Sequence, residues 1–130
     1  MAHLHIEYSA GLAARADIAG LCTAAHGAMV RTGIFPLAGI RVRAFQSDFA
    51  IVADGLAEND FCALTLSVGA GRSRADLAAA GTLIFTALQT ALAGPLSTTH
   101  FALSLEIREI DPGLSWKDTP IHARLAAKAI

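Results

Sequence analysis

Hydrophobic and polar residues alternate over 3–8, which reads HLHIEY. A period of two is typical of a strand with one buried face, so we expect a strand here and a turn at 9–11 (SAG). Chain ends are usually loose. A strand that begins this close to the start is therefore expected either to reflect trimming or to be a working part of the protein.

The next apolar residues recur at helical spacing, and one helix face would carry Ile18, Leu21, Cys22, Ala25 and Met29. Asp17 is a suitable N-cap, and Gly33 can end the helix. The stretch 33–39 (GIFPLAG) is too rich in Gly and Pro for regular structure, and alternation returns at 40–44 (IRVRA). The first half therefore predicts strand, helix, strand.

The second half repeats this order. Residues 62–68 (CALTLSV) alternate as a strand, and a tight turn at 69–71 (GAG) follows. Ser73 and Asp76 form a capping box that opens a helix, whose apolar stripe is Leu77, Gly81, Ile84, Leu88 and Leu92. Gly94-Pro95 is expected to stop this helix, and 101–107 (FALSLEI) is the next strand.

Shifting the sequence by 59 residues places RADIA at 15–19 over RADLA at 74–78. Because the order and spacing of the elements also agree, we predict an internal duplication with repeats of about 2–58 and 61–112. Two β-α-β units with right-handed crossovers would form one four-stranded sheet with two helices on one face. We therefore expect an α+β fold in which 1–130 is a single domain.

The remaining segment, 113–130, is an extension with a turn at Pro112-Gly113 and helical potential over 121–128. We expect it to wrap a neighbouring subunit or to close a sheet edge. Hydrophobic residues make up 54% of the chain, above the usual level of about 45 to 50%. This surplus predicts an obligate oligomer, with the apolar excess on the uncovered sheet face.

The net charge is −1, and like charges form no runs. This composition argues against nucleic acid or an acidic membrane as partner and favours a small molecule or a protein. No apolar run approaches 18 residues and no signal-peptide pattern is present, so we expect a cytoplasmic protein without a membrane span.

The loop 69–73 (GAGRS) leads into a helix start, where free backbone N–H groups suit an anion. Arg72 and Arg74 lie where cations oppose the helix dipole. They indicate either a ligand carboxylate or side chains that simply extend into water. The phosphate-binding patterns GxxxxGK[ST] and GxGxxG are absent.

Arg41 and Arg43 share one face of the 40–44 strand, about 7 Å apart. Two guanidiniums at this spacing repel each other unless an anion lies between them. In one arrangement, one arginine points into a site while the other pairs with Glu7 or Glu106; in the other, both are solvated edge residues.

Other reactive residues give weaker signals. Cys22 and Cys62 are expected to be small buried hydrophobes. His3 and His5 share a strand face but have no evident third ligand, so we expect no metal site. The nucleophile and zinc motifs GxSxG and HExxH are also absent.

Several blocks together resemble one known family. These are 32–43 (TGIFPLAGIRVR), 53–55 (ADG), 69–73 (GAGRS), 103–107 (LSLEI) and the early HxxIE at 3–7. The combination resembles the 5-carboxymethyl-2-hydroxymuconate isomerases of the tautomerase superfamily, from residue 2 to about 123. The resemblance implies two β-α-β units, a homotrimer, no cofactor and a role in bacterial homoprotocatechuate breakdown.

In that family a proton moves along a conjugated 2-hydroxydienoate tricarboxylate to give its 2-oxo-3-ene isomer. The resemblance implies that the base is the amine of an N-terminal proline exposed by removal of Met1. It also implies that Arg41 and Arg72 hold carboxylates and the developing enolate, with Arg43 as a further substrate-binding residue. A terminal amine near guanidiniums favours its neutral form and suits a base near neutral pH.

This chain has Ala2 where the family has proline. Removal of Met1 would leave a primary amine at the same place, without the ring that fixes its orientation. Three outcomes follow: a working isomerase with altered efficiency, a relative that acts on another 2-oxo or 2-hydroxy acid, or a non-catalytic trimer that binds carboxylates.

Overall fold

The computed structural model describes residues 1–128. Its strands are β1 (Ala2–Ser9), β2 (Ile40–Ser47), β3 (Asp60–Gly69) and β4 (Phe101–Ile110). Its α-helices are α1 (Ile18–Arg31), α2 (Arg74–Ala91), α3 (Ala93–Leu96) and α4 (Pro120–Lys128). Short 3-10 turns are η1 (Ala10–Ala14), η2 (Leu37–Gly39) and η3 (Pro112–Leu114).

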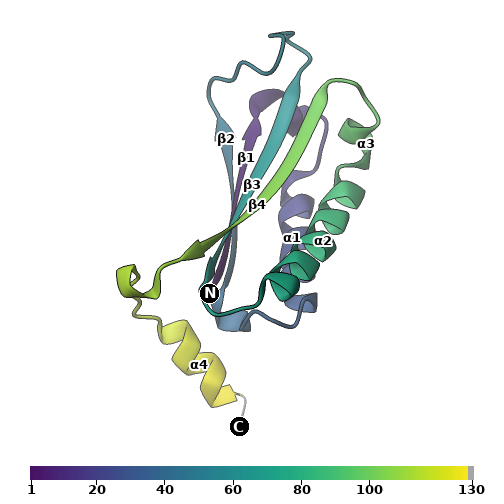
Figure 1. Cartoon of the computed structure of the whole chain (residues 1–130). Helices are drawn as coiled ribbons and strands as arrows, with labels where there is room; N and C mark the ends of the chain where they lie inside the picture. Colours follow the sequence, from purple (N-terminus) through teal and green to yellow (C-terminus); the bar gives the residue numbers. More distant parts are fainter. Residues whose placement is uncertain (129–130) are drawn as a thin grey trace.

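The strands form one sheet in the order β2-β1-β3-β4, and α1 and α2 cover one face of it (Figure 1). β1 is parallel to β2, β3 is parallel to β4, and the two inner strands are antiparallel. This arrangement confirms the predicted pair of β-α-β units and the α+β class. The duplication and its repeat boundaries stay predictions.

The register brings the start of β1 to one end of the sheet together with two other strand ends. Ala2 lies opposite Ile40 at the start of β2 and opposite Val68 near the end of β3. The N-terminus is therefore flanked by backbone on both sides (Figure 1).

The predicted helix caps are confirmed. The Asp17 carboxylate accepts a hydrogen bond from the Gly20 N–H at 2.9 Å, and the Ser73 hydroxyl accepts one from the Asp76 N–H at 3.1 Å. The predicted stop at Gly94-Pro95 is wrong, because α2 already ends at Ala91. The Gly-Pro pair lies instead inside the short α3, where proline is tolerated in a first turn.

The core lies between the sheet and the two long helices and is built from the apolar stripes of the sequence. Leu4 and Ile6 from β1, Met29 from α1 and Ile84 from α2 are fully buried. Cys62 is buried too, as predicted, and burial with the nearby Cys22 raises the pKa of its thiol to about 12. Such a thiol is inert and serves as packing.

The uncovered sheet face differs from the prediction. On β1, β2 and β3, alternation and register place there mainly polar or small side chains: His3, His5, Glu7, Arg41, Arg43, Phe45, Phe61, Ala63, Thr65 and Ser67. The expectation that this face carries the apolar excess is therefore wrong. The most exposed large apolar side chains are Phe49 and Ile51 in the loop after β2 and Trp116 in the extension, at 95%, 92% and 84% exposure.

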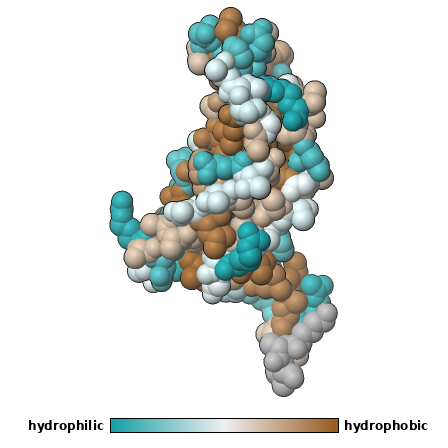
Figure 2. Space-filling model, turned by 90° about the vertical axis from the view of Figure 1, so that its right-hand side faces the viewer, coloured by the Kyte–Doolittle hydropathy of each residue, from teal (hydrophilic) through white to brown (hydrophobic). Residues whose placement is uncertain are grey.

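Figure 2 shows brown apolar patches interspersed with hydrophilic surface on the side of the molecule it presents. Among residues 1–128, no helix is both long and apolar enough to cross a membrane.

Candidate active site

The start of the chain is packed closely against η2 and β3. A Cβ added at Gly39 would lie 3.1 Å from both the nitrogen and the Cα of Met1, so only glycine leaves ordinary room there. The Met1 carbonyl accepts a hydrogen bond from the Gly69 N–H at 3.4 Å. Ala2, the next residue, is fully buried. The terminal amine is thus held in a defined place at the end of the sheet.

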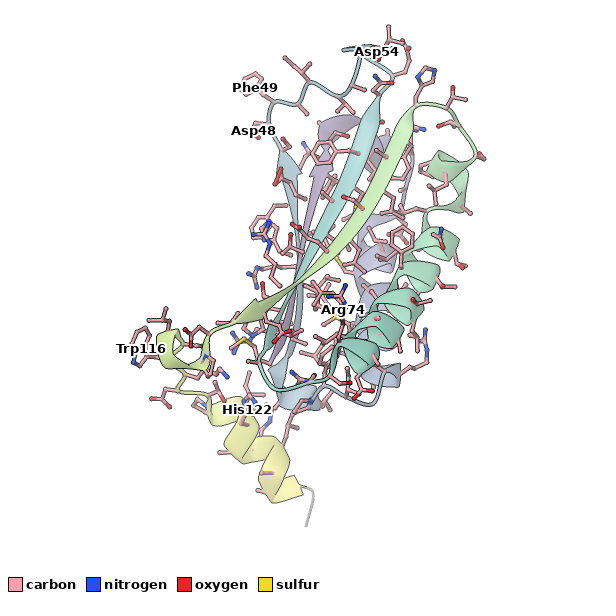
Figure 3. All side chains as sticks on the ribbon, viewed as in Figure 1. Asp48, Phe49, Asp54, Arg74, Trp116 and His122 are labelled. Atoms are coloured by element: carbon pink, nitrogen blue, oxygen red, sulfur yellow. The ribbon has the colours of Figure 1, made fainter. Side chains whose placement is uncertain are left out.

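A pocket of about 350 Å³ opens beside this amine, and we call it the amine pocket. It is lined by Met1, His3, Arg41, Ile110, Ser115, Trp116, Lys117, Asp118 and Thr119. Its walls come from the starts of β1 and β2, the end of β4 and the segment before α4. Figure 3 shows Trp116 and His122 at this end of the molecule and Asp54 at the other.

A larger hollow of about 540 Å³ between α1 and α2 is a weaker candidate site. Alanine, threonine and leucine side chains line most of it, and Arg31 is the one charged residue in its lining. Ligand sites usually combine a concave surface with a few convergent polar groups. The amine pocket meets that description, and the interhelical hollow does not.

Arg72 lies in the loop between β3 and α2, at the end of the sheet where β1 starts. Its Nε donates to the Ile34 carbonyl at 3.1 Å, its Nη1 donates to the Gly69 carbonyl at 3.2 Å, and its guanidinium lies 4.9 Å from the centre of the Phe35 ring. Gly71 has a φ of +111°, which permits the tight turn. Neutral groups therefore hold the Arg72 cation in place and leave its charge uncompensated.

The cations at this end change the acid–base behaviour of their neighbours. Burial, Arg72 and Lys117 lower the pKa of the Met1 amine below its ordinary value of 8.0. Burial, Arg41, Arg43, the terminal amine and Lys117 lower the pKa of His3. Both shifts favour the neutral forms, so a larger fraction of the amine is unprotonated and able to accept a proton, and a smaller fraction of His3 is charged.

Of the three predicted arginines, only Arg41 lines the amine pocket, whereas Arg72 lies outside its lining but acts on the charge of the Met1 amine. Arg41 lies opposite His3 in the register and lines the amine pocket. Arg43 lies opposite His5, one step further along the same face, and is not part of the pocket lining. Its substrate-binding role stays a prediction.

Neither arginine of β2 pairs with a glutamate within residues 1–128, so the predicted pairing with Glu7 or Glu106 is wrong. Glu106 instead pairs with Arg108 at 2.7 Å. Arg74, the first residue of α2, lines a separate hollow with Glu109.

Sequence reasoning missed the contribution of the C-terminal extension. Its helix α4 packs against η2, and the segment before it supplies Lys117 and Thr119 to the amine pocket. The Thr119 hydroxyl contacts Nδ1 of His122, whose Nε2 lies toward Gly39. Isolated residues in a polar tail carry no spacing signal, so only the fold could place them. In the described part of the chain, no three His, Cys, Asp or Glu side chains gather to hold a metal ion.

Comparisons with known proteins agree with this geometry. Residues 2–125 match the family model described as 5-carboxymethyl-2-hydroxymuconate isomerase. The 5-carboxymethyl-2-hydroxymuconate Delta-isomerase of Escherichia coli is 37% identical over 123 residues, which cover 95% of this chain and 98% of that protein.

Two solved structures share the fold closely. A 5-carboxymethyl-2-hydroxymuconate isomerase from Deinococcus radiodurans R1 is 33% identical with a TM-score of 0.88, over 95% of this chain and 93% of that one. A crystal structure of a 5-carboxymethyl-2-hydroxymuconate delta-isomerase gives 28% identity and a TM-score of 0.89, over 96% and 93%. These matches confirm the predicted isomerase class, and the chain belongs to the 5-carboxymethyl-2-hydroxymuconate isomerase family.

Proposed function

We propose that this protein isomerises 5-carboxymethyl-2-hydroxymuconate in homoprotocatechuate catabolism by a cofactor-free proton shift, with the Ala2 amine as base once Met1 is removed. The observation that carries the proposal is the meeting of a terminal amine with Arg41 and Arg72 at one end of the sheet. Neither arginine has a carboxylate partner within residues 1–128. Such a site suits a small polyanion and a developing negative charge.

The proposed chemistry needs only the amine and the cations. The neutral amine accepts the proton of the substrate 2-hydroxyl group, and the electron pair moves along the conjugated system to form the 2-oxo group. The resulting ammonium returns a proton to the far carbon of the diene. Arg41 and Arg72 bind carboxylates and stabilise the enolate charge that exists between the two transfers.

Removal of Met1 would change the site in two ways. The amine would move to Ala2, in contact with the space that Met1 fills. The Gly69 N–H, which now donates to the Met1 carbonyl, would lose this acceptor and become available to a substrate oxygen. Both changes increase the capacity of the pocket for an anion.

Ala2 supports a second candidate function, because a primary amine lacks the ring that orients the family base. The alternatives are action on another 2-oxo acid and carboxylate binding without turnover. Both alternatives keep the cations of the amine pocket and differ from the isomerase proposal only in the role of the amine.

We also propose that the protein is a homotrimer. The hydrophobic content of 54% supports an oligomer, and the exposed Phe49, Ile51 and Trp116 side chains are available for burial against neighbouring subunits. Sedimentation should then give three times the chain mass, and a monomer would contradict the proposal.

Two measurements test the isomerase proposal. The intact mass should correspond to a chain that starts at Ala2; if Met1 is retained, the amine is one residue away from its required place. The second measurement is an ultraviolet assay with 5-carboxymethyl-2-hydroxymuconate on wild type, Arg41→Ala, Ala2→Pro and the control Arg74→Ala.

Activity of the wild type and of Arg74→Ala, with loss in Arg41→Ala, supports the proposal. Turnover that appears only in Ala2→Pro would favour the carboxylate-binding alternative. Proline is tolerated at the first position of a strand, so this variant should fold.

A further inference from the structure

The C-terminal extension reaches the amine pocket by a fixed route. It leaves β4 at Ile110, turns through η3 and docks through α4 on η2, next to the start of β2 (Figure 1). Residues 115–119 lie between these two attachments and line the pocket. The extension is thus part of the wall of the site.

Lys117 is the cation that this wall supplies. It lines the amine pocket with Arg41 and His3, and its charge acts on both the terminal amine and His3. No ion pair of Lys117 is formed among residues 1–128. Asp118 also lines the pocket, but it is the only carboxylate in that lining.

Three cations therefore come to this end of the sheet from different elements: Arg41 from β2 and Lys117 from the extension line the amine pocket, and Arg72 from the loop after β3 acts with Lys117 on the charge of the Met1 amine. Burial and the neighbouring cations lower the pKa of His3, which favours its neutral ring over a fourth cation. The proposed substrate carries three carboxylates, two on the muconate chain and one on the carboxymethyl group. A dicarboxylate of the same conjugated type would use one cation fewer.

We propose that Lys117 binds a substrate carboxylate and gives the pocket its preference for three carboxylates over two. This inference rests on the proposed function. The Lys117 ammonium lies at the end of a flexible four-carbon side chain, which suits a mobile carboxymethyl group. Arg41 and Arg72, in contrast, extend from the sheet and from a tight loop. Lys117 is therefore a specificity-determining residue, and the amine remains the base.

The kinetic test compares wild type, Lys117→Met and Lys117→Arg with the control Arg124→Met, which removes an exposed cation from α4. For 5-carboxymethyl-2-hydroxymuconate, Lys117→Met should raise KM about tenfold and leave kcat within about twofold. For 2-hydroxymuconate, which lacks the carboxymethyl group, the KM of Lys117→Met should differ from that of wild type by less than about twofold. Lys117→Arg should restore most of the lost affinity, and Arg124→Met should match wild type.

A binding test separates this inference from the proposed function. Titration calorimetry with tricarballylate, an unreactive tricarboxylate, and with glutarate, a dicarboxylate, needs no turnover. Lys117→Met should weaken tricarballylate about tenfold and glutarate much less.

The outcomes are distinct. If wild type turns over neither muconate but Lys117→Met still weakens tricarballylate selectively, the isomerase proposal fails and the role of Lys117 stands. Normal turnover with a Lys117→Met variant that matches Arg124→Met in both assays overturns the role of Lys117 alone. A wild type that neither reacts nor binds tricarballylate overturns both.

Discussion

The two ends of the sheet hold cations in opposite ways. At the end where β1 finishes, Arg15 makes a 2.7 Å ion pair with Asp60, whose carboxylate also accepts the Ser9 hydroxyl at 2.7 Å. At the end where β1 starts, Arg41 and Arg72 have no carboxylate partner within residues 1–128. One end is satisfied internally, and the other is arranged for an anion from outside.

The predicted duplication makes this difference more informative. In the 59-residue shift, Asp60 at the start of β3 corresponds to Met1 just before β1, and His100 corresponds to Arg41. Position 60 would then hold a carboxylate that forms an ion pair at one end of the sheet. The equivalent position 1 would hold a terminal amine at the other end, which is free to receive an anion. The predicted duplication thus implies that related folding units carry a stabilising ion pair at one end and the proposed site at the other.

Removal of a cation from the open end should have the largest effect on activity. Arg41→Ala should lower kcat/KM about 100-fold to 1,000-fold, because an enolate would lose a charged partner. The melting temperature should stay close to that of wild type, since Arg41 is exposed and makes no ion pair within residues 1–128. Assay and thermal unfolding of the same preparation check both statements; a large loss of stability would show that the open end is structural.

The opposite result is expected at the closed end. Asp60→Ala should lower the free energy of unfolding by about 2 to 3 kcal/mol, because the Arg15 charge and the Ser9 hydroxyl lose a buried partner. Its kcat/KM should stay within about twofold of wild type. Urea unfolding provides the measurement, with Asp48→Ala, an exposed carboxylate after β2, as control (Figure 3). Equal stability of the two variants would contradict the contrast between the ends.

The pH dependence of activity tests the amine itself. Burial, Arg72 and Lys117 lower the pKa of the Met1 amine from 8.0. The Ala2 amine exposed by removal of Met1 is expected to lie beside the same cations, so its basic form should persist below pH 8. As pH falls through that lowered pKa, kcat/KM should decrease about tenfold per pH unit. A pH–rate profile on wild type gives the midpoint of this limb, and a midpoint above 8 would exclude an amine in this environment as the base.

The smallest effect should come from Arg43. Its side chain shares the open face with Arg41 but is outside the lining of the amine pocket. Arg43→Ala should therefore change kcat/KM by less than about threefold. Steady-state assays of Arg43→Ala and Arg41→Ala give the comparison. An equally large loss of kcat/KM in both variants would show that the site extends along β2.

Local patterns predicted most of the fold, because strand alternation, helical stripes and the caps at Asp17 and Ser73 are encoded within short segments. Arg41 and Arg72 were also predictable, since they belong to blocks that resemble a known family. Lys117 was not, because its position depends on how α4 docks on η2, a contact between segments about 80 residues apart. The location of the surplus apolar residues was predicted wrongly for a similar reason, because the sequence does not say which loops stay exposed.

The close packing of Met1 against Gly39 makes one backbone position a reporter of processing. With Met1 present, a methyl group at residue 39 would press on its backbone at 3.1 Å, and Gly39→Ala should cost about 1 kcal/mol. Without Met1, both 3.1 Å contacts would be lost, and the next nearest atom, His122 Nε2, lies at 3.8 Å, an ordinary contact. The stability of one glycine variant can thus reveal which form of the N-terminus a cell has made.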